Sequence, residues 1–312
     1  IGDISARRVE AYLDELRQIE GERGKPISAQ TRNYYLQSVK QFTRWLVQNR
    51  RTSDNPLVHL SRVNPRTDRR HDRRPLSAEE FALLIEAARK GPEVEGVEGP
   101  VRAMLYIVAA WTGLRRGELA SLTPRSFSLD TEPATVTVEA AYSKHRREDT
   151  LPLHPSLVEQ LRKWLKGKPA RKPLFPVGDR KTSKMMRRDL ERAREAWLKK
   201  AKTKEERARR EGTSFLAYVD DAGRFADFHA TRHTFITNLC KSKVSPKDAQ
   251  ALARHSTITL TMDVYSHVGV HDQAAAVGCL PPAPTPGGKG KRQPAPERGR
   301  ATGTDGRSMV PP

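Results

Sequence analysis

The sequence predicts a mainly α-helical protein with a small antiparallel β-sheet, divided into a smaller N-terminal unit and a larger C-terminal unit. Apolar residues recur at the helical period over residues 4–60. Residues 134–142 and 149–153 instead show the alternation and β-branched content of two short strands. Residues 62–74 carry six arginines and a proline with no apolar period, so we expect a linker there.

The N-terminal unit is predicted to contain two amphipathic helices. The first repeats apolar residues at i, i+3, i+4 and i+7, and the second begins at Ser28, whose hydroxyl is a suitable N-cap. The residues expected on the apolar faces are Val9, Tyr12, Leu13 and Leu16 in the first helix and Tyr35, Val39, Phe42 and Leu46 in the second.

The larger unit opens with Ser77 and Glu80, whose spacing predicts a capping box at the start of a helix. Residues 101–111 are apolar nearly all round, which indicates a central buried helix. Residues 143–148 are expected to form the turn between the two strands. The other expected helices are a long basic one over 184–210 with Met186, Leu190, Ala193 and Trp197, one over 228–240 with Phe235, Ile236 and Leu239, and a short one capped by Ser256 that carries Met262 and Tyr265.

The composition favours a nucleic-acid partner. The 312 residues include 57 Lys and Arg against 37 Asp and Glu, a net charge of +20. No apolar run approaches the roughly 20 residues of a membrane span, and the first residues are too charged for a signal peptide. Two cysteines, Cys240 and Cys279, suit a reducing cytosol. We therefore expect a cytoplasmic protein with no membrane partner.

The expected organisation is a helical unit over residues 1–61, a basic linker over 62–74, a larger domain over 75–280 and a disordered basic tail over 281–312. The tail is rich in Pro, Gly, Lys and Arg and poor in apolar residues. The arginines of the linker are expected to lie against phosphates. Residues 160–212 form a second basic stretch, with 20 Lys and Arg against 7 Asp and Glu.

Four short segments carry residues suited to phosphate chemistry. They are residues 112–118 (TGLRRGE), 142–145 (YSKH), 229–233 (HATRH) and 254–256 (RHS), the last followed by Tyr265. An arginine just behind the glycine that ends an apolar helix is held rigidly and can grip a phosphate with two nitrogens. His229 and Arg232 share a helix face and can reach one group. His229 and His233 have the spacing of a zinc pair but lack the glutamate of that motif, so we expect no metal.

The four segments, in this order, resemble the tyrosine recombinase (phage integrase) family. TGLR with a glutamate three residues on is similar to the first-arginine box, and the hairpin lysine ahead of LPL is similar to the β-turn lysine. HATRH resembles the second-arginine box, and LARHS followed by YSH resembles the box that ends in the nucleophile. Over residues 75 to about 270 the resemblance rests on the sequence motifs, and over residues 1–60 it rests on the arrangement of the domains. It implies an N-terminal helical core-binding (SAM-like) domain and a C-terminal integrase-type catalytic domain.

The resemblance implies a site-specific recombinase that cuts DNA by attack of Tyr265 on phosphorus, leaving a 3′-phosphotyrosine link and a free 5′ hydroxyl. Arg115 and Arg232 are expected to bond the phosphate oxygens, and Lys144 to protonate the departing oxygen. The expected catalytic residues are Arg115, Lys144, His229, Arg232, His255 and Tyr265, with Glu118 as a supporting residue. The link conserves the energy of the broken bond, so neither ATP nor a cofactor is expected.

The remaining roles also come from the resemblance. His229 is expected to be the general base, His255 to give the phosphate a third hydrogen bond, and Glu118 to orient Arg115 or a histidine. The implied partners are double-stranded DNA, a homotetramer on two DNA sites, and directionality or host DNA-bending factors, with a nucleoid-associated location. Residues 268–280 would then pack on a neighbouring subunit.

The basic stretch and tail favour an integrase of a mobile element. The alternatives are a chromosome-dimer-resolving recombinase, a non-catalytic DNA-binding protein of the same fold, a type IB topoisomerase and, more distantly, a metal-dependent nuclease. Because the sequence begins with Ile1 and not with methionine, the presence of a preceding DNA-arm-binding domain is left open. Two features depart from the family pattern: Arg254 stands where many members have glycine, and the gap from His255 to Tyr265 is ten, where some members have nine.

Overall fold

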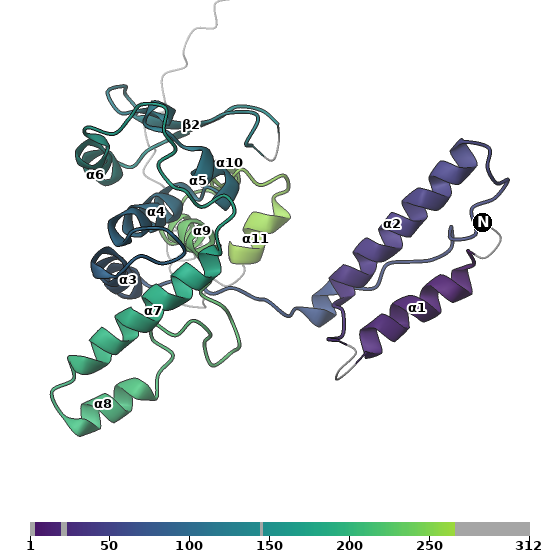
Figure 1. Cartoon of the computed structure of the whole chain (residues 1–312), viewed down its shortest axis with the longest axis horizontal. Coiled ribbons are helices and arrows are strands. Elements are labelled where there is room, and N and C mark those ends of the chain that lie inside the picture. The colour runs from purple at the N-terminus through teal and green to yellow at the C-terminus, as the bar shows by residue number, and fades with distance from the viewer. Residues whose placement is uncertain (1–3, 20–23, 144–145, 266–312) are drawn as a thin grey trace, which may run out of the picture. The chain divides into compact units, whose positions relative to one another are not determined.

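The computed structural model describes residues 4–19, 24–143 and 146–265, and it confirms a mainly α-helical chain with a small antiparallel sheet (Figure 1). The helices are α1 (Ala6–Gln18), α2 (Ala29–Gln48), α3 (Ala78–Lys90), α4 (Gly99–Thr112), α5 (Arg116–Ser121), α6 (Pro155–Leu165), α7 (Thr182–Lys199), α8 (Lys204–Glu211), α9 (Ala230–Lys241), α10 (Pro246–Ala253) and α11 (Thr259–Tyr265). The 3-10 helices are η2 (Pro65–Asp68) and η3 (Pro124–Ser126), and the strands are β1 (Phe127–Ser128), β2 (Thr135–Val138) and β3 (Asp149–Pro152). Within the described ranges no helix is long and apolar enough to span a membrane. The expected docking segment 268–280 and tail 281–312 lie outside them.

The N-terminal unit consists of α1 and α2, with the predicted N-cap of α2, and the apolar face expected for α2 is only partly buried. The Ser28 hydroxyl accepts a hydrogen bond from the backbone N–H of Thr31, as expected. Leu46 is buried, whereas Tyr35 is 46% exposed and Phe42 48% exposed. The reason is that α2 turns its most buried side to the segment that follows it, where the amide of Asn33 pairs with the backbone of residue 63.

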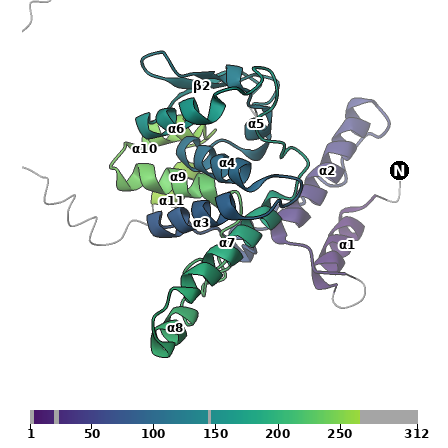
Figure 2. The same ribbon diagram turned by 60° about the vertical axis from the view of Figure 1, so that its left-hand side comes forward.

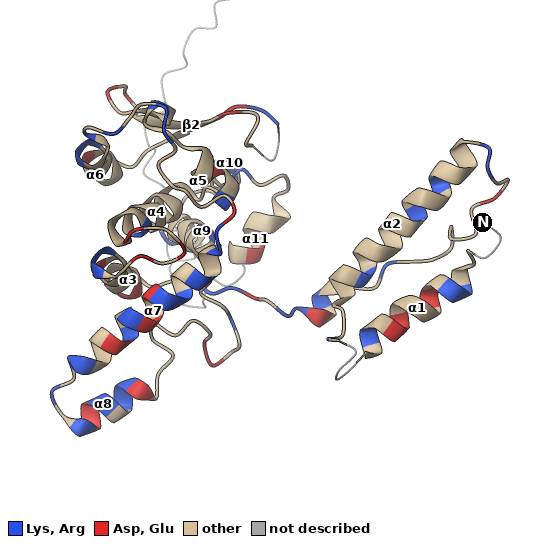
Figure 3. Cartoon of the chain, viewed as in Figure 1, with Lys and Arg blue, Asp and Glu red and all other residues tan. Residues whose placement is uncertain are grey.

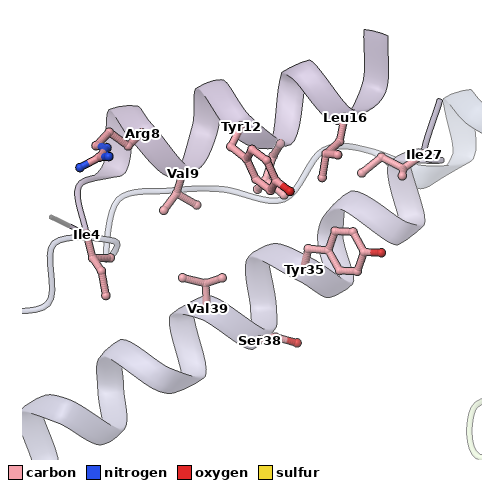
Figure 4. Close-up of a pocket in the computed structure, with 10 residues that line it drawn as sticks. Ile4, Arg8, Val9, Tyr12, Leu16, Ile27, Tyr35, Ser38 and Val39 are labelled. Carbon is pink, nitrogen blue, oxygen red and sulfur yellow. The ribbon is translucent and has the colours of Figure 1, made fainter. Parts of the chain in front are cut away.

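The other side of α2 faces α1 across an apolar pocket. Val9, Tyr12 and Leu16 of α1 and Tyr35 and Val39 of α2 line it, with their side chains turned toward the space between the two helices (Figure 4). The predicted apolar stripes therefore do face each other. They leave a groove instead of a closed core, because few side chains beyond these two rows fill the space.

Three of the linker arginines bond groups within the protein, and contact between the linker and DNA phosphates stays a prediction. Arg70 donates to the backbone carbonyls of residues 26 and 27. Arg73 bonds the Asp227 carboxylate at 2.9 Å, and Arg74 bonds the buried Glu80 carboxylate at 2.9 Å. Arg70 also bonds the Asp68 carboxylate within the linker at 2.7 Å, whereas Arg73 and Arg74 pair with acids of the larger unit. The linker is thereby tied to the start of α9 and of α3.

The larger unit is built around α4, which confirms the predicted central helix. It contacts α3, α6 and α9, and the two views in Figures 1 and 2 place it among them. Leu105, Tyr106 and Val108 are fully buried. The capping box of α3 is present, with the Ser77 hydroxyl accepting from Glu80 N–H and the Glu80 carboxylate accepting from Ser77 N–H. These contacts fix the end of α4, where the first predicted site residues begin.

The sheet confirms the two predicted strands, in shortened form, and adds β1. The strands run antiparallel in the order β1-β2-β3, with Val136 opposite Leu151. The core faces of β2 and β3 are buried at Val136, Val138 and Leu151 because one side of the sheet packs on the helices. The loop between β2 and β3 spans 139–148, longer than the predicted turn, and Lys144 lies outside the described residues.

The predicted single helix over 184–210 is wrong, because the structure has α7 and α8 in its place. The Thr203 hydroxyl accepts a hydrogen bond from the backbone N–H of Glu206 and starts a new helix after a break at 200–203. Red and blue alternate along both helices in Figure 3, since acids pair with the bases, as in the bridges Arg207–Glu211 and Arg210–Glu206. Met186, Leu190 and Ala193 are buried as expected.

Candidate active site

Arg115 is held by the turn that joins α4 to α5. Gly113 ends α4 with φ of +63°, in the left-handed conformation that glycine adopts without strain. Two residues later Arg115 occupies the N-cap position of α5. Glu118 accepts the Arg115 backbone N–H at 2.7 Å and its Nη1 at 3.1 Å. The Arg115 side chain stays 26% exposed, so it is oriented by Glu118 and still open to a ligand.

Arg232 lies on α9 and reaches across to the same turn. Its Nη1 donates to the carbonyl of Gly113 and its Nη2 to the carbonyl of Ala253, and the residue is 3% exposed. Burial, together with the charges of Arg115 and Arg254, lowers the pKa of Arg232 to about 9. The guanidinium is still charged at neutral pH. Burial is the larger cause and the neighbouring positive charges add to it, so a bound anion would favour the charged guanidinium.

Replacing Gly113 with alanine is expected to lower the free energy of unfolding by about 1–3 kcal/mol. A Cβ at this position lies 2.5 Å from Cδ1 of Phe235, and φ is positive, so both packing and backbone oppose the change. Thermal denaturation measures the effect. The matched control is Gly117→Ala in α5, where a Cβ meets nothing within 4 Å, so its stability should stay equal or rise slightly. Equal losses in both variants would contradict the argument.

Glu118 is the carboxylate that the arginines share. Arg254, 3% exposed, donates from Nη2 to Glu118 at 2.7 Å, on the oxygen that also accepts Arg115 N–H. Burial by itself opposes ionisation of Glu118, but the backbone N–H of Arg115 and the guanidinium of Arg254 outweigh it and lower the Glu118 pKa. Arg115 and Arg254 thus share one ionised acid, and Arg232 bonds the carbonyl of Gly113 at the neighbouring turn. The three guanidiniums outnumber the two nearby acids, Glu118 and Asp149, which leaves a net positive site.

Three histidines border this positive cluster. His229 is exposed at the N-cap of α9 and lines an open pocket of about 300 Å³ together with Arg73, Arg116 and Arg232. His255 follows α10, and its Nδ1 lies 2.9 Å from the Thr261 hydroxyl on α11. Burial, with the charges of Arg232 and Arg115, lowers the pKa of His255 to about 4. The imidazole is therefore neutral at pH 7 and able to donate one N–H.

The half-buried histidine His233 gives the fold a pH dependence with a defined sign. Burial, then the charge of Arg73, lowers its pKa from 6.5 to about 4. Between these two values the unfolded chain binds more protons than the folded one, so the free energy of unfolding falls as the pH drops through that window. From pH 7 to pH 5 the expected loss due to this histidine is about 2 kcal/mol. Melting curves at both pH values should show a smaller difference for His233→Gln than for the unchanged protein; equal differences would contradict this.

The structure places five of the predicted residues together: Arg115, Glu118, His229, Arg232 and His255 surround the end of α4 and the start of α9. Tyr265 is the last residue of α11, the helix that bonds His255 through Thr261. The structure describes the backbone of Tyr265 but not its side chain. The expected helix start at Ser256 is wrong, because α11 begins at Thr259 after a turn.

Sequence reasoning missed two residues of this region. From the sequence, Arg254 was noted only as a departure from the glycine of the family pattern. That departure was the signal in the sequence that could have pointed to a role for its side chain. Asp227, 5% exposed, bonds Arg73 and His71 and accepts the Ala230 N–H at the start of α9. No local sequence pattern predicted this role for Asp227. His229 and His233 lie edge to face with ring centroids 5.9 Å apart. In the described ranges no group of three or more His, Cys, Asp or Glu is placed to hold a metal.

The fold and this arrangement of arginines and histidines define a protein of the tyrosine recombinase class. The family model described as "Phage integrase family" matches residues 74–271, which is more than half of the chain. The chain therefore belongs to the phage integrase family. The match includes every predicted site residue, and it covers the larger unit and not the N-terminal helices.

Two curated proteins are similar in sequence. A probable site-specific recombinase in the afa region of Escherichia coli is 32% identical over 184 residues, which cover 56% of this chain and 65% of that protein. The alignment thus spans just under two thirds of that relative. The tyrosine recombinase XerC of Chlorobaculum parvum is 26% identical over 292 residues, covering 85% of this chain and 81% of the relative.

Solved structures share the fold. The Tn1549 transposon integrase in complex with a circular intermediate DNA has a TM-score of 0.58 at 17% identity, over 90% of this chain and 87% of that one. The XerH site-specific recombinase bound to its difH substrate has a TM-score of 0.56 at 16% identity, over 89% and 71% of the two chains. At these identities the likeness establishes the fold alone.

Proposed function

We propose that the protein is a site-specific DNA recombinase that cuts and rejoins strands through a 3′-phosphotyrosine intermediate. The observation that carries the proposal is the gathering of Arg115, Arg232 and Arg254 at the end of α4, where Arg115 and Arg254 share Glu118 and Arg232 bonds the carbonyl of Gly113. A site with this surplus of fixed positive charge suits a phosphodiester whose negative charge grows during displacement at phosphorus. Family membership and DNA-bound relatives of the same fold support DNA as the substrate.

In the proposed reaction the Tyr265 oxygen attacks the phosphorus as the bond to the 5′ oxygen breaks. Arg115 and Arg232 bond the non-bridging oxygens, and neutral His255 donates a third hydrogen bond. His229, exposed and beside Arg232, accepts the phenol proton, and Lys144 gives a proton to the departing 5′ oxygen. Attack by a second strand's 5′ hydroxyl reverses each transfer. One phosphodiester is exchanged for another of similar energy, so no ATP is consumed.

The direct test is a duplex nicked just 3′ of the cleavage point, from which the released fragment diffuses away and traps the intermediate. We expect a covalent DNA adduct of the 35.1 kDa chain, formed equally well in EDTA because the guanidiniums supply the charge. Absence of any adduct at a verified target sequence would leave a non-catalytic DNA-binding protein of the same fold. Strand cleavage that needs a divalent metal and leaves no covalent adduct would indicate a nuclease.

We further propose a mobile-element integrase, which the strongly basic character of 160–212 supports. The similarity to XerC over most of both chains favours chromosome-dimer resolution as the alternative. Recombination between two copies of an element end, compared with two copies of a chromosomal terminus site, distinguishes them. Either role calls for a homotetramer on two DNA sites, with accessory factors, in the cytoplasm at the nucleoid. Relaxation of plasmids without any target site would indicate a type IB topoisomerase.

The proposed division of labour places core DNA binding in residues 1–61, a connection in 62–74, catalysis in 75–280 and a basic tail in 281–312. Contacts to DNA phosphates would give most of the affinity, so binding should weaken steeply with salt. The groove between α1 and α2 belongs to the first of these parts, and the arginine cluster to the third.

A further inference from the structure

Arg254 occupies a backbone position that a non-glycine residue adopts only under strain. It ends α10 with φ of 53° and ψ of 47°, in the left-handed region, and its N–H closes the helix on the carbonyls of Gln250 and Ala251. Glycine adopts this conformation freely, whereas an arginine adopts it at a cost in conformational energy. A strained arginine at this position leads us to ask what its side chain does there.

The Arg254 side chain runs inward and joins two acids. It lies 2.7 Å from the Glu118 carboxylate on α5 and 3.7 Å from the Asp149 carboxylate at the start of β3. Each acid holds a second group: Glu118 orients Arg115 through two hydrogen bonds, and Asp149 accepts the hydroxyl of Ser143 at 2.9 Å. Arg254 therefore links the α5 turn to the base of the β2–β3 loop.

Arg254 and Arg115 differ in exposure, which indicates that their side chains have different tasks. The Arg254 side chain is 3% exposed, so its guanidinium is turned to the acids and not to a ligand. The Arg115 side chain is 26% exposed and shares Glu118 with it. If Glu118 bonded Arg115 alone, the attraction would draw that guanidinium toward the acid. A second, buried guanidinium takes up part of the carboxylate's charge and leaves Arg115 oriented but available.

We propose that Arg254 is a positioning residue: through Glu118 it fixes the Arg115 guanidinium to meet a phosphate oxygen. The inference rests on the proposed recombinase function. It predicts a defect of a particular kind. Loss of Arg254 should slow cleavage to the extent that cleavage depends on neutralising the phosphate charge, and should matter little where that charge is absent.

The test compares Arg254→Gly with the unchanged protein on two nicked duplexes. One has an ordinary scissile phosphate, and in the other a methyl group replaces one non-bridging oxygen, which removes its charge. The single-turnover rate of adduct formation, at saturating protein, is expected to fall about 10- to 100-fold on the charged substrate. On the uncharged substrate the two proteins should differ by less than about threefold. Lys90→Ala, which breaks an exposed ion pair with Glu86, is the control and should change neither rate.

Equal rates of both proteins on the charged substrate would overturn the proposal, as would an equal slowing on both substrates, which marks a general structural defect. If melting shows the glycine variant to be unfolded, Arg254→Lys decides: it keeps the charge but lacks the planar fork. A lysine variant slow on the charged substrate alone supports the proposal, and one as fast as the unchanged protein contradicts it. A lack of adduct with the unchanged protein instead contradicts the recombinase function, independently of Arg254.

Discussion

Tyr265→Phe is expected to reduce covalent adduct formation to background while leaving DNA binding intact. The change removes one oxygen, the atom that is proposed to join phosphorus. Removal of a nucleophile from a comparable enzyme costs on the order of 10⁶ in rate. The measurement is adduct formation on the nicked duplex, with noncovalent affinity measured in parallel by gel shift or fluorescence anisotropy.

The control for this prediction is Tyr142→Phe. Tyr142 is 55% exposed in the loop between β2 and β3, close in sequence to Lys144, and so it is the rival phenol nearest another proposed catalytic residue. Adduct formation by this variant should equal that of the unchanged protein. An adduct that survives Tyr265→Phe and disappears with Tyr142→Phe would transfer the nucleophile to the loop and refute the proposed geometry.

Arg232→Gln is expected to slow cleavage by about 10²–10³ and also to weaken the fold. The guanidinium serves two purposes. Two of its nitrogens hold the carbonyls of Gly113 and Ala253, and its charge is available to a phosphate. Glutamine keeps some hydrogen-bonding capacity but loses the charge and the reach. We expect the free energy of unfolding to fall by about 1–3 kcal/mol as a buried carbonyl loses its donor.

Cleavage at saturating protein, measured well below the melting temperature, separates the two effects of Arg232→Gln. The matched control is Arg162→Gln on α6, where Nη2 likewise donates to a backbone carbonyl, that of Leu129, but at an exposed position away from the cluster. It should cleave at the normal rate. A normal rate for Arg232→Gln would contradict a direct role for this guanidinium, whatever happens to stability.

Local patterns in the sequence were sufficient where neighbours in the chain decide the structure. The Ser77–Glu80 capping box, the N-cap at Ser28 and the buried helix that ends at Gly113 all depend on residues within one or two turns. For the same reason the TGLR segment was placed correctly at the end of that helix. The short strands were also recognisable, because their alternation reflects one buried face.

Contacts between segments that are distant in the sequence could not be predicted from local patterns. The buried side of α2 depends on where residues 55–64 return along it, so periodicity could not tell that Leu46 is buried while Phe42, on the same apolar face, is exposed. The bond between Glu118 and Arg254 joins residues 136 positions apart. Periodicity also continued across the break before Thr203, where a single hydroxyl starts a new helix. In the first two cases tertiary contacts decide the outcome, and in the third a local N-cap outweighs the continuing helical period.

The central claim is that the tyrosine ending α11 becomes bonded to DNA at a phosphate held by Arg115 and Arg232. The most direct measurement is proteolysis of the trapped DNA adduct followed by mass spectrometry of the peptide that carries the nucleotide. We predict a peptide containing Tyr265 esterified to the 3′ phosphate of the cleaved strand, with a free 5′ hydroxyl on the other product. A nucleotide attached to any other residue, or linked through a 5′ phosphate, would contradict the claim.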